Sequence, residues 1–335
     1  MHRLLAAGAA LTLAVPAPAF HFADPRITEA SGLAFGLRSP GVVYVQNDSG
    51  DTNRFFAVDV RTGATAATIT VAGASNVDWE DLAVGRDAAG VPSVWLADTG
   101  DNLAARPEVR IYRVAEPRVA ATERDRRLDT QPAAVWRLRY PDGPTDAEGL
   151  AVGSGGTAYV VTKSVLGRSV VYRVPPHPDA DHVQALQRVG TIELTPRAVP
   201  NPFGFPGELA ITGAAISPDG STFAVRTYAE AYLWRLGPGG VPAALRERPQ
   251  FVRLPRQPQG EGIALPPSSP PSSPPSSPPV SGPASARPTR AVARPASGHS
   301  RWSLVLAGLA IAVVLGVGIW RFRAGSRSTP GSTGR

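Results

Sequence analysis

The sequence predicts an all-β domain followed by one C-terminal transmembrane helix, and three observations support this fold class. A short motif, made of a polar residue, Gly or Asp, a small or aliphatic residue and Ala, recurs five times between residues 31 and 265. Each of the first four copies is followed by further apolar runs that end in turn residues, and helical periodicity is almost absent. A run of 19 residues without a charge, Trp302 to Trp320, is long enough to span a bilayer.

The repeated motif divides the domain into units of four short strands. Its copies lie 49, 68, 64 and 49 residues apart and span Ser31–Phe35, Glu80–Val84, Glu148–Val152, Thr212–Ile216 and Glu261–Leu265. Second strands are expected at 42–46, 94–97, 158–162 and 222–226, third strands at 55–60, 109–114, 169–174 and 231–236, and fourth strands at 64–71, 134–140, 186–194 and 251–254. This pattern is typical of a β-propeller, with a two-sheet sandwich as the alternative. We therefore predict about five four-stranded blades.

The fifth unit is expected to be incomplete. After Glu261–Leu265 the chain enters a Pro- and Ser-rich segment at once, so three strands of the closing blade have no sequence to form them. We expect the N-terminal segment His21–Ile27 to supply an outer strand to this blade. An incomplete blade exposes strand edges, which proteins usually protect.

The two ends of the chain indicate a membrane-anchored surface protein. Residues 1–19 combine a basic start, a short apolar run and a small-residue cleavage site, as signal peptides do. Residues 20–265 form the extracellular propeller domain, and 266–301 a Pro/Ser-rich stalk that would reach about 110 Å if extended. Residues 302–320 form the transmembrane helix and 321–335 a basic cytoplasmic tail. The prediction is a single-pass protein of the cell membrane, anchored by this helix, with its N-terminal domain extracytoplasmic.

Composition excludes several classes of function. The chain has no cysteine, which rules out disulfides and thiol chemistry. The net charge of +7 is misleading, because all 27 acidic residues lie in 20–265 while nine of the 34 basic residues lie outside it. The domain itself is therefore slightly acidic, and we predict no nucleic-acid partner. Serine-hydrolase, P-loop and zinc-protease motifs are also missing from the sequence.

Polar residues gather where a propeller brings its top face together. In this fold the residues before each first strand and those after each second strand meet around the axis. Acidic residues precede or begin the first strands, namely Glu29, Asp78, Glu80, Asp81, Asp146, Glu148 and Glu261. The second strands are followed by Asn47–Asp51, Asp98–Asn102, Lys163–Ser164 and Arg226–Tyr228. We therefore expect an acidic rim that also carries one lysine and one arginine.

The acidic rim predicts Ca²⁺ as a cofactor, because this ion takes six to eight oxygen ligands from flexible loops. The predicted metal ligands are Glu80, Asp98, Asp101, Glu148, Glu261 and Asp48, and Lys163 and Arg226 are the predicted anion-binding residues. Two alternatives stay open. Asp48 and Asp98 stand in good turn sequences and would then bond their own backbone. The glutamates would alternatively form a structural network of ion pairs with Lys163 or Arg226. The metal-like run His177–His182 is expected to be a solvated loop on the bottom rim.

At these residues the chain resembles secreted or surface-anchored bacterial β-propellers that are WD40-like and related to the "esterase-like activity of phytase" domain. The stretches that carry the resemblance are Asn47–Asp51, Glu80–Ala83, Ala97–Asn102, Asp146–Leu150, Val161–Ser164, Arg226–Tyr228 and Gly260–Ala264. The resemblance covers most of 26–265 and implies a fold more than an activity. Relatives usually continue the strand after the last motif, and this chain does not.

Two functions follow from these expectations. The first is an extracytoplasmic binding or sensing module that presents its acidic, Ca²⁺-binding top face to an extracellular ligand or cell-wall component. The alternative is a Ca²⁺-dependent, phytase-like phosphoesterase on the same face. In it Glu80, Asp98, Glu148 and Glu261 would hold the metal, and Lys163 and Arg226 the phosphate. A metal site requires several carboxylates near one point without an arginine partner for each, whereas a structural scaffold requires them to be paired.

Overall fold

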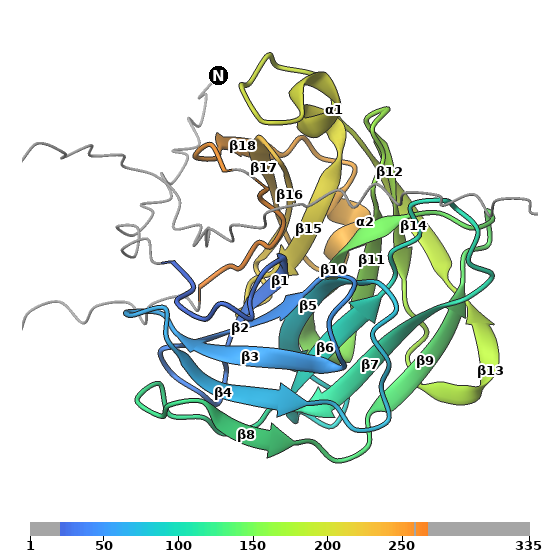
Figure 1. The fold of residues 1–335 in the computed structure, drawn as a ribbon. Coiled ribbons are helices and arrows are strands. Elements are labelled where there is room, and N and C mark those ends of the chain that lie inside the picture. The colour runs from blue at the N-terminus through green and yellow to red at the C-terminus, as the bar shows by residue number, and fades with distance from the viewer. Residues whose placement is uncertain (1–20, 258, 267–335) are drawn as a thin grey trace, which may run out of the picture.

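A computed structural model of the chain describes residues 21–257 and 259–266, and it shows four β-sheets arranged around an axis as the blades of a propeller (Figure 1). The predicted signal peptide, the stalk after Pro266, the transmembrane helix and the basic tail lie outside the described residues. Within the described part of the chain, no helix has the length and apolar character needed to cross a membrane.

Each blade consists of four antiparallel strands that run in chain order from the axis outward, as the sequence predicts. Blade 1 contains β1 (Ala30–Phe35), β2 (Val42–Asn47), β3 (Arg54–Asp59) and β4 (Thr65–Thr70), and blade 2 contains β5 (Trp79–Arg86), β6 (Pro92–Asp98), β7 (Val109–Ala115) and β9 (Ala134–Arg139). Blade 3 contains β10 (Ala147–Val152), β11 (Ala158–Thr162), β12 (Arg168–Arg173) and β14 (Gln187–Glu193), and blade 4 contains β15 (Ile211–Ile216), β16 (Thr222–Thr227), β17 (Glu230–Arg235) and β18 (Gln250–Arg253). Short helices lie between some of these strands, namely η1 (Ser154–Gly156), α1 (Gly204–Leu209) and α2 (Gly240–Ala244).

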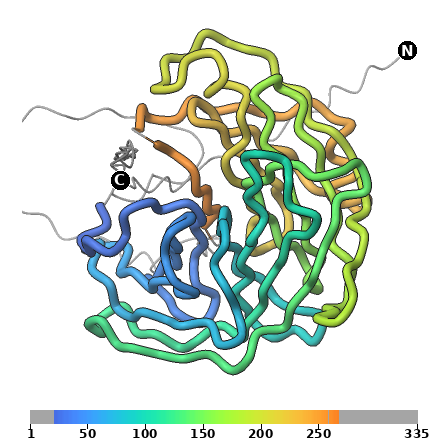
Figure 2. Tube along the Cα trace, turned by 45° about the vertical axis from the view of Figure 1, so that its right-hand side comes forward, coloured from blue at the N-terminus to red at the C-terminus, as the bar shows by residue number. Residues whose placement is uncertain are grey.

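The fifth unit is a single extended segment, so the prediction of about five blades is corrected to four blades in the described chain. Figure 2 shows this orange segment between the blue first blade and the yellow-to-orange fourth blade. Ile263 and Leu265 pack on blade 4, and Ala264 packs on blade 1. The segment His21–Ile27 forms no outer strand. It has one single-residue bridge at its start and packs Phe22 and Ile27 against blade 1.

Two outer strands were missed by the sequence analysis. β8 (Arg126–Asp129) adds in parallel to β4 of blade 1, although it belongs to the connection between β7 and β9 of blade 2. β13 (Asp179–Ala185) adds in parallel to β9 of blade 2 and comes from the connection between β12 and β14 of blade 3. Each of these two strands therefore links its own blade to the preceding blade. The prediction that His177–His182 is a loop is wrong from Asp179 onward, although this part of β13 remains largely exposed.

The blades pack through buried side chains that fill the space between neighbouring sheets. One cluster joins blades 1 and 2, another joins blades 2 and 3, and a third joins blades 3 and 4. Trp79, Trp95 and Trp136 are among the largest side chains that are completely buried. In blade 3 the place of an added outer strand is taken by α2, whose Val241 and Ala244 pack with Ile192 of β14.

Near the axis the backbones of the inner strands approach one another closely. A Cβ on Gly32 would overlap the amide nitrogen of Leu82, and one on Gly213 would overlap the carbonyl oxygen of Glu261. Glycine is required at these positions because no side chain fits. The fully buried carboxylate of Asp81 accepts hydrogen bonds from the amides of Leu82, Leu150 and Ala214, at 2.8, 2.7 and 3.1 Å. Asp81 thus ties the inner strands of blades 2, 3 and 4 together.

The two ends of the axis differ in character. We call the end where the inner strands begin the top face and the end where they finish the bottom face. The bottom opening is lined by apolar side chains at the ends of the inner strands, including Phe35, Val84, Val152, Ile216 and Leu265. The chain passes from the fifth segment to Pro266 at this bottom face.

Candidate cation-binding site

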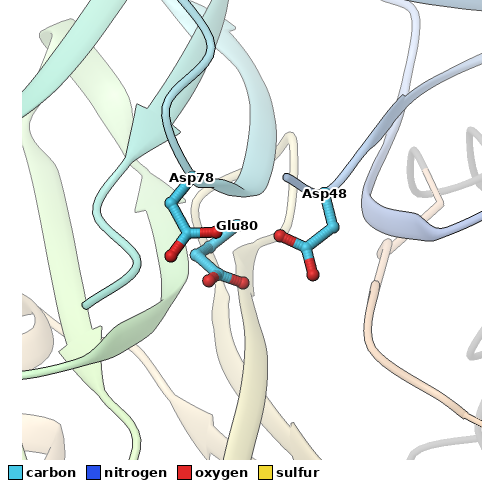
Figure 3. A group of neighbouring side chains, drawn as sticks. All are labelled: Asp48, Asp78 and Glu80. Atoms are coloured by element: carbon cyan, nitrogen blue, oxygen red, sulfur yellow. The ribbon is translucent and has the colours of Figure 1, made fainter. Parts of the chain in front are cut away.

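Five carboxylates from three blades meet on the top face. Asp48 follows β2, Asp78 and Glu80 lie at the start of β5, and Asp146 and Glu148 lie at the start of β10. Figure 3 shows the first three with their carboxylates gathered in one place, with Asp48 on one segment and Asp78 and Glu80 on another. Single oxygen atoms of Asp48, Asp78 and Glu80 lie within 4.8 Å of one another, as do those of Glu80, Asp146 and Glu148. Glu80 therefore belongs to both groups.

The loops that carry these carboxylates are held together by polar contacts. The side-chain amide of Asn76 donates to the carbonyl oxygen of Asp48 at 3.1 Å, which joins the entry of blade 2 to blade 1. The amide of Asp101 donates to Asp146 at 2.9 Å, which joins blade 2 to blade 3. The first contact uses only the backbone of Asp48, whereas the second uses one oxygen atom of the Asp146 carboxylate, and together they hold the loops of the three blades near one another.

Glu80 is the most unusual member of the cluster. Its residue is only 3% exposed, yet within the described chain its carboxylate accepts no hydrogen bond and forms no ion pair. Glu148 is 4% exposed, and its Oε2 atom also lacks a hydrogen-bond partner among the described residues. A buried carboxylate without a partner carries a large free-energy cost. The arrangement is therefore suited to receive a cation.

Burial and mutual repulsion raise the pKa values in the cluster. Burial is the main cause for Glu80, whose pKa lies well above its usual value, with Glu148 the strongest charged contributor. Burial and Glu261 raise the pKa of Asp48 to about 6. Burial and Asp48 raise the pKa of Asp78 to about 7. In the absence of a cation Asp78 is therefore partly protonated at neutral pH, and a bound cation would compete with this proton.

Lowering the pH is expected to stabilise the cation-free protein. The pKa values of Asp48 and Asp78 are about 6 and about 7 in the folded protein, whereas an aspartate in the unfolded chain has its ordinary value of 3.8. Protonation of these two groups therefore stabilises the folded state fully below pH 3.8. This stabilisation is lost as the pH rises through their pKa values in the folded protein. In EDTA we expect a melting temperature at least about 5 °C higher at pH 5 than at pH 8. The double variant Asp48→Asn, Asp78→Asn should lose most of this dependence, and a melting temperature that falls on acidification would contradict the expectation.

Three of the predicted metal ligands already bond other groups of the protein and lie outside the two carboxylate groups. Asp98 forms an ion pair of 2.9 Å with Arg106 and accepts the amide of Asp78 at 3.1 Å, so it positions the loop that carries Asp78. Asp101 accepts the amides of Ala105 and Arg106 at 2.8 and 2.9 Å and closes its own turn. Glu261 accepts a hydrogen bond of 2.6 Å from the side chain of Gln259. Asp48, Glu80 and Glu148 are the predicted ligands that the fold brings together.

The two predicted anion-binding residues are already engaged with protein groups. Lys163 forms an ion pair with Glu148 through Oε1, and its ammonium lies 5.9 Å from the ring centre of Tyr228. Arg226 is completely buried and donates to the carbonyl oxygens of Thr227 and Gly262 and to the side chain of Gln257, at 3.2, 3.0 and 3.1 Å. Burial lowers the pKa of Arg226 to about 10. Its contacts hold the fifth segment against blade 4.

The ligands predicted from the sequence did not include Asp78 and Asp146, which complete the two carboxylate groups. The sequence contains a signal that would have found them. Asp78 and Asp146 each stand two residues before a motif glutamate, so the pattern Asp-x-Glu occurs at the start of both β5 and β10. In an extended chain, residues two apart project to the same face. In the fifth unit the corresponding residue is Gln259, which donates to Glu261 instead of adding a carboxylate.

Exposed apolar side chains surround the acidic cluster on the top-face loops. We call them the apolar collar, and they are Val77, Leu103, Val165, Leu166, Phe203 and Phe205. Leu103 and Leu166 are 88% and 86% exposed. The ring of Phe203 lies 4.3 Å from that of Tyr228, which connects the collar to Lys163. Apolar side chains gathered on one face of a protein usually mark an interaction surface.

Comparisons with known proteins show similarity at the level of fold only. No family model matches the chain, so the resemblance to WD40-like and phytase-related propellers stays a prediction, and no curated protein matches its sequence. Among solved structures, the PQQ-bound aldose sugar dehydrogenase from Streptomyces coelicolor is 12% identical over 71% of this chain and 85% of its own, with a TM-score of 0.35. A streptogramin B lyase is 12% identical over 72% of this chain and 60% of its own, with a TM-score of 0.35. The virginiamycin B lyase from Staphylococcus aureus is 10% identical over 72% of this chain and 61% of its own, with a TM-score of 0.34. These similarities carry no information about the chemistry of this chain, which folds as an all-β propeller.

Proposed function

We propose that this protein is a membrane-anchored, extracytoplasmic binding module whose top face binds a divalent cation, Ca²⁺, between Asp48, Asp78, Glu80, Asp146 and Glu148. The observation that carries the proposal is Glu80, a buried carboxylate that has no partner in the described chain and faces four other carboxylates. A bound cation would supply the missing partner for Glu80 and for the free Oε2 atom of Glu148. A purely structural network would instead pair these groups with basic residues.

The chemistry of the donors favours Ca²⁺ over transition metals. The cluster contains only carboxylate oxygens, with no histidine in either group and no cysteine anywhere in the chain. Hard cations such as Ca²⁺ and Mg²⁺ prefer oxygen ligands. Asp48, Asp78 and Asp146 lie outside the strands, and ligands on loops suit the adaptable coordination of Ca²⁺ better than the strict octahedron of Mg²⁺.

The placement of the cluster suits recognition of an external ligand. The chain leaves the propeller at Pro266 on the bottom face, so a stalk that follows it would hold the top face away from the anchor. The apolar collar adds contact area around the cation site. We therefore assign recognition of an extracellular ligand or cell-wall component to this face.

Phosphoester hydrolysis is the less favoured function for the same face. It requires a free cationic group to hold the phosphate, and Lys163 pairs with Glu148 while Arg226 bonds carbonyl oxygens inside the ring. A phosphoesterase therefore depends on the metal alone for its anion contacts. If the Ca²⁺-loaded protein hydrolysed p-nitrophenyl phosphate and the variant Glu80→Gln did not, phosphoester hydrolysis would become the favoured function.

A Ca²⁺ titration of the melting temperature tests the proposal. At a concentration 100 times the dissociation constant, a bound ligand stabilises the folded state by about 2.7 kcal/mol, which is a rise of roughly 5 °C or more for a domain of this size. We expect this rise in the purified full-length protein in detergent at pH 8. The variant Glu80→Gln should abolish it, and the control Glu193→Gln, in an exposed carboxylate of β14, should keep it. No shift at millimolar Ca²⁺ in the unaltered protein would refute the proposed cation site.

A further inference from the structure

The carboxylates of the top face form two groups rather than one. Asp48, Asp78 and Glu80 make the first group, and Glu80, Asp146 and Glu148 make the second, each within 4.8 Å. Each of these groups, which we call triads, contains only three of the five carboxylates. A single ion centred in one triad would leave the two outer carboxylates of the other triad without a cation.

The unpartnered atoms point to ligands in both groups. Glu80 is only 3% exposed, and its two oxygen atoms have no hydrogen-bond or ion-pair partner in the described chain. Glu148 uses Oε1 for Lys163 and leaves Oε2 buried without a partner. One free carboxylate thus belongs to both triads, and a second free oxygen belongs to the second triad alone.

The charges of the cluster favour two divalent ions. The five carboxylates and the ammonium of Lys163 leave four negative charges when all are ionised. Two divalent cations neutralise this charge, whereas one leaves half of it uncompensated in a largely buried place. Of the neighbouring acids, Asp98 pairs with Arg106, whereas Glu29 and Glu261 form no ion pair in the described chain and add to the negative charge beside Asp48.

We infer that the top face binds a pair of divalent cations, with Glu80 as the ligand that the two ions share. Asp48 and Asp78 complete the first position, and Asp146 and Glu148 complete the second. Three carboxylates for each ion leave further positions of a Ca²⁺ coordination shell open to water or to an oxygen atom of the external ligand. This inference rests on the proposed cation site and specifies its stoichiometry.

The stoichiometry of Ca²⁺ binding tests the inference. Equilibrium dialysis of the full-length protein in detergent at pH 8, with radioactive Ca²⁺ as the probe, should give two ions per chain. The variants Asp48→Asn and Asp146→Asn should each bind one ion, and Glu80→Gln should bind none. The control Glu193→Gln should bind two. Circular dichroism verifies folding, and Asp78→Asn, which should also bind one ion, replaces Asp48→Asn if that variant does not fold.

The possible results distinguish a pair of bound ions from a single bound ion. One ion per chain in the unaltered protein, or complete loss of binding in both Asp48→Asn and Asp146→Asn, would show one shared site and overturn the pair while leaving the proposed function intact. No binding by the unaltered protein would overturn both the pair of ions and the proposed function.

The charge balance adds a further expectation, since removing the ammonium in Lys163→Met should raise the affinity for Ca²⁺ by about tenfold through lost repulsion. An unchanged affinity would contradict the role of Lys163 in that balance.

Discussion

Replacing Asp81 by alanine is expected to lower the free energy of unfolding by about 2–6 kcal/mol, because at least two buried amides lose an acceptor at about 1–3 kcal/mol each. The carboxylate of Asp81 is fully buried and accepts the amides of Leu82, Leu150 and Ala214. Two of these amides belong to the inner strands of other blades. The substitution therefore acts on the contacts between blades rather than on one sheet.

The variant Asp81→Asn is the matched comparison, because its amide oxygen can still accept one or two of the three hydrogen bonds. We expect it to lose less than half as much stability as Asp81→Ala in urea denaturation of the full-length protein. The surface variant Asp129→Ala, at an exposed position of β8, should change stability by no more than about 0.5 kcal/mol. Equal stability of Asp81→Ala and the unaltered protein would show that the axis is held by packing alone.

Replacing Gly100 by alanine is expected to weaken Ca²⁺ binding by about tenfold or more, through displacement of ligands that the site must hold in place. A Cβ at this position would overlap Oε1 of Glu80 and Oδ2 of Asp78. Both are the mobile ends of side chains, so the backbone can stay in place while the carboxylates move apart. The substitution thus changes the geometry of the site without changing its charge.

The control for this prediction is Gly237→Ala, because a Cβ on Gly237 meets no atom within 4 Å. Both variants should fold, with melting temperatures in EDTA within a few degrees of the unaltered protein. Only Gly100→Ala should show a clearly smaller Ca²⁺-dependent rise in melting temperature than the unaltered protein at the same Ca²⁺ concentration. Undiminished Ca²⁺ binding by Gly100→Ala would place the cation away from Glu80 and Asp78.

The strands of the four blades were predictable because their side chains follow a regular pattern. β2, β6 and β16 each contain a central apolar run that is buried on both faces, and the motif marks each inner strand. β8 and β13 were missed because their sequences, RRLD and DADHVQA, are polar and largely exposed. Their strand conformation comes from pairing with the outer strand of the preceding blade. Such tertiary pairing overrides local preference.

The position of the candidate site was predictable, and its exact membership was not. The fold places the acidic residues of the top face around the axis, and Glu80 and Glu148 were identified from their equal positions in the motif. The sequence does not reveal that Arg226 turns inward to carbonyl oxygens, or that Lys163 pairs with Glu148. These choices depend on distances between blades. The closing segment was likewise recognised by its motif, but its place between blades 1 and 4 follows from packing of Ile263 and Ala264.

A crystal structure of the full-length protein grown with a Ca²⁺ salt, with anomalous scattering recorded at a wavelength where Ca²⁺ contributes, tests the cation site most directly. The account predicts anomalous peaks in contact with the carboxylate of Glu80, one toward Asp48 and Asp78 and one toward Asp146 and Glu148. Crystals of Glu80→Gln should show neither peak. A Glu80 carboxylate that remains free of any ion at millimolar Ca²⁺, or that turns to pair with Lys163, would contradict the account.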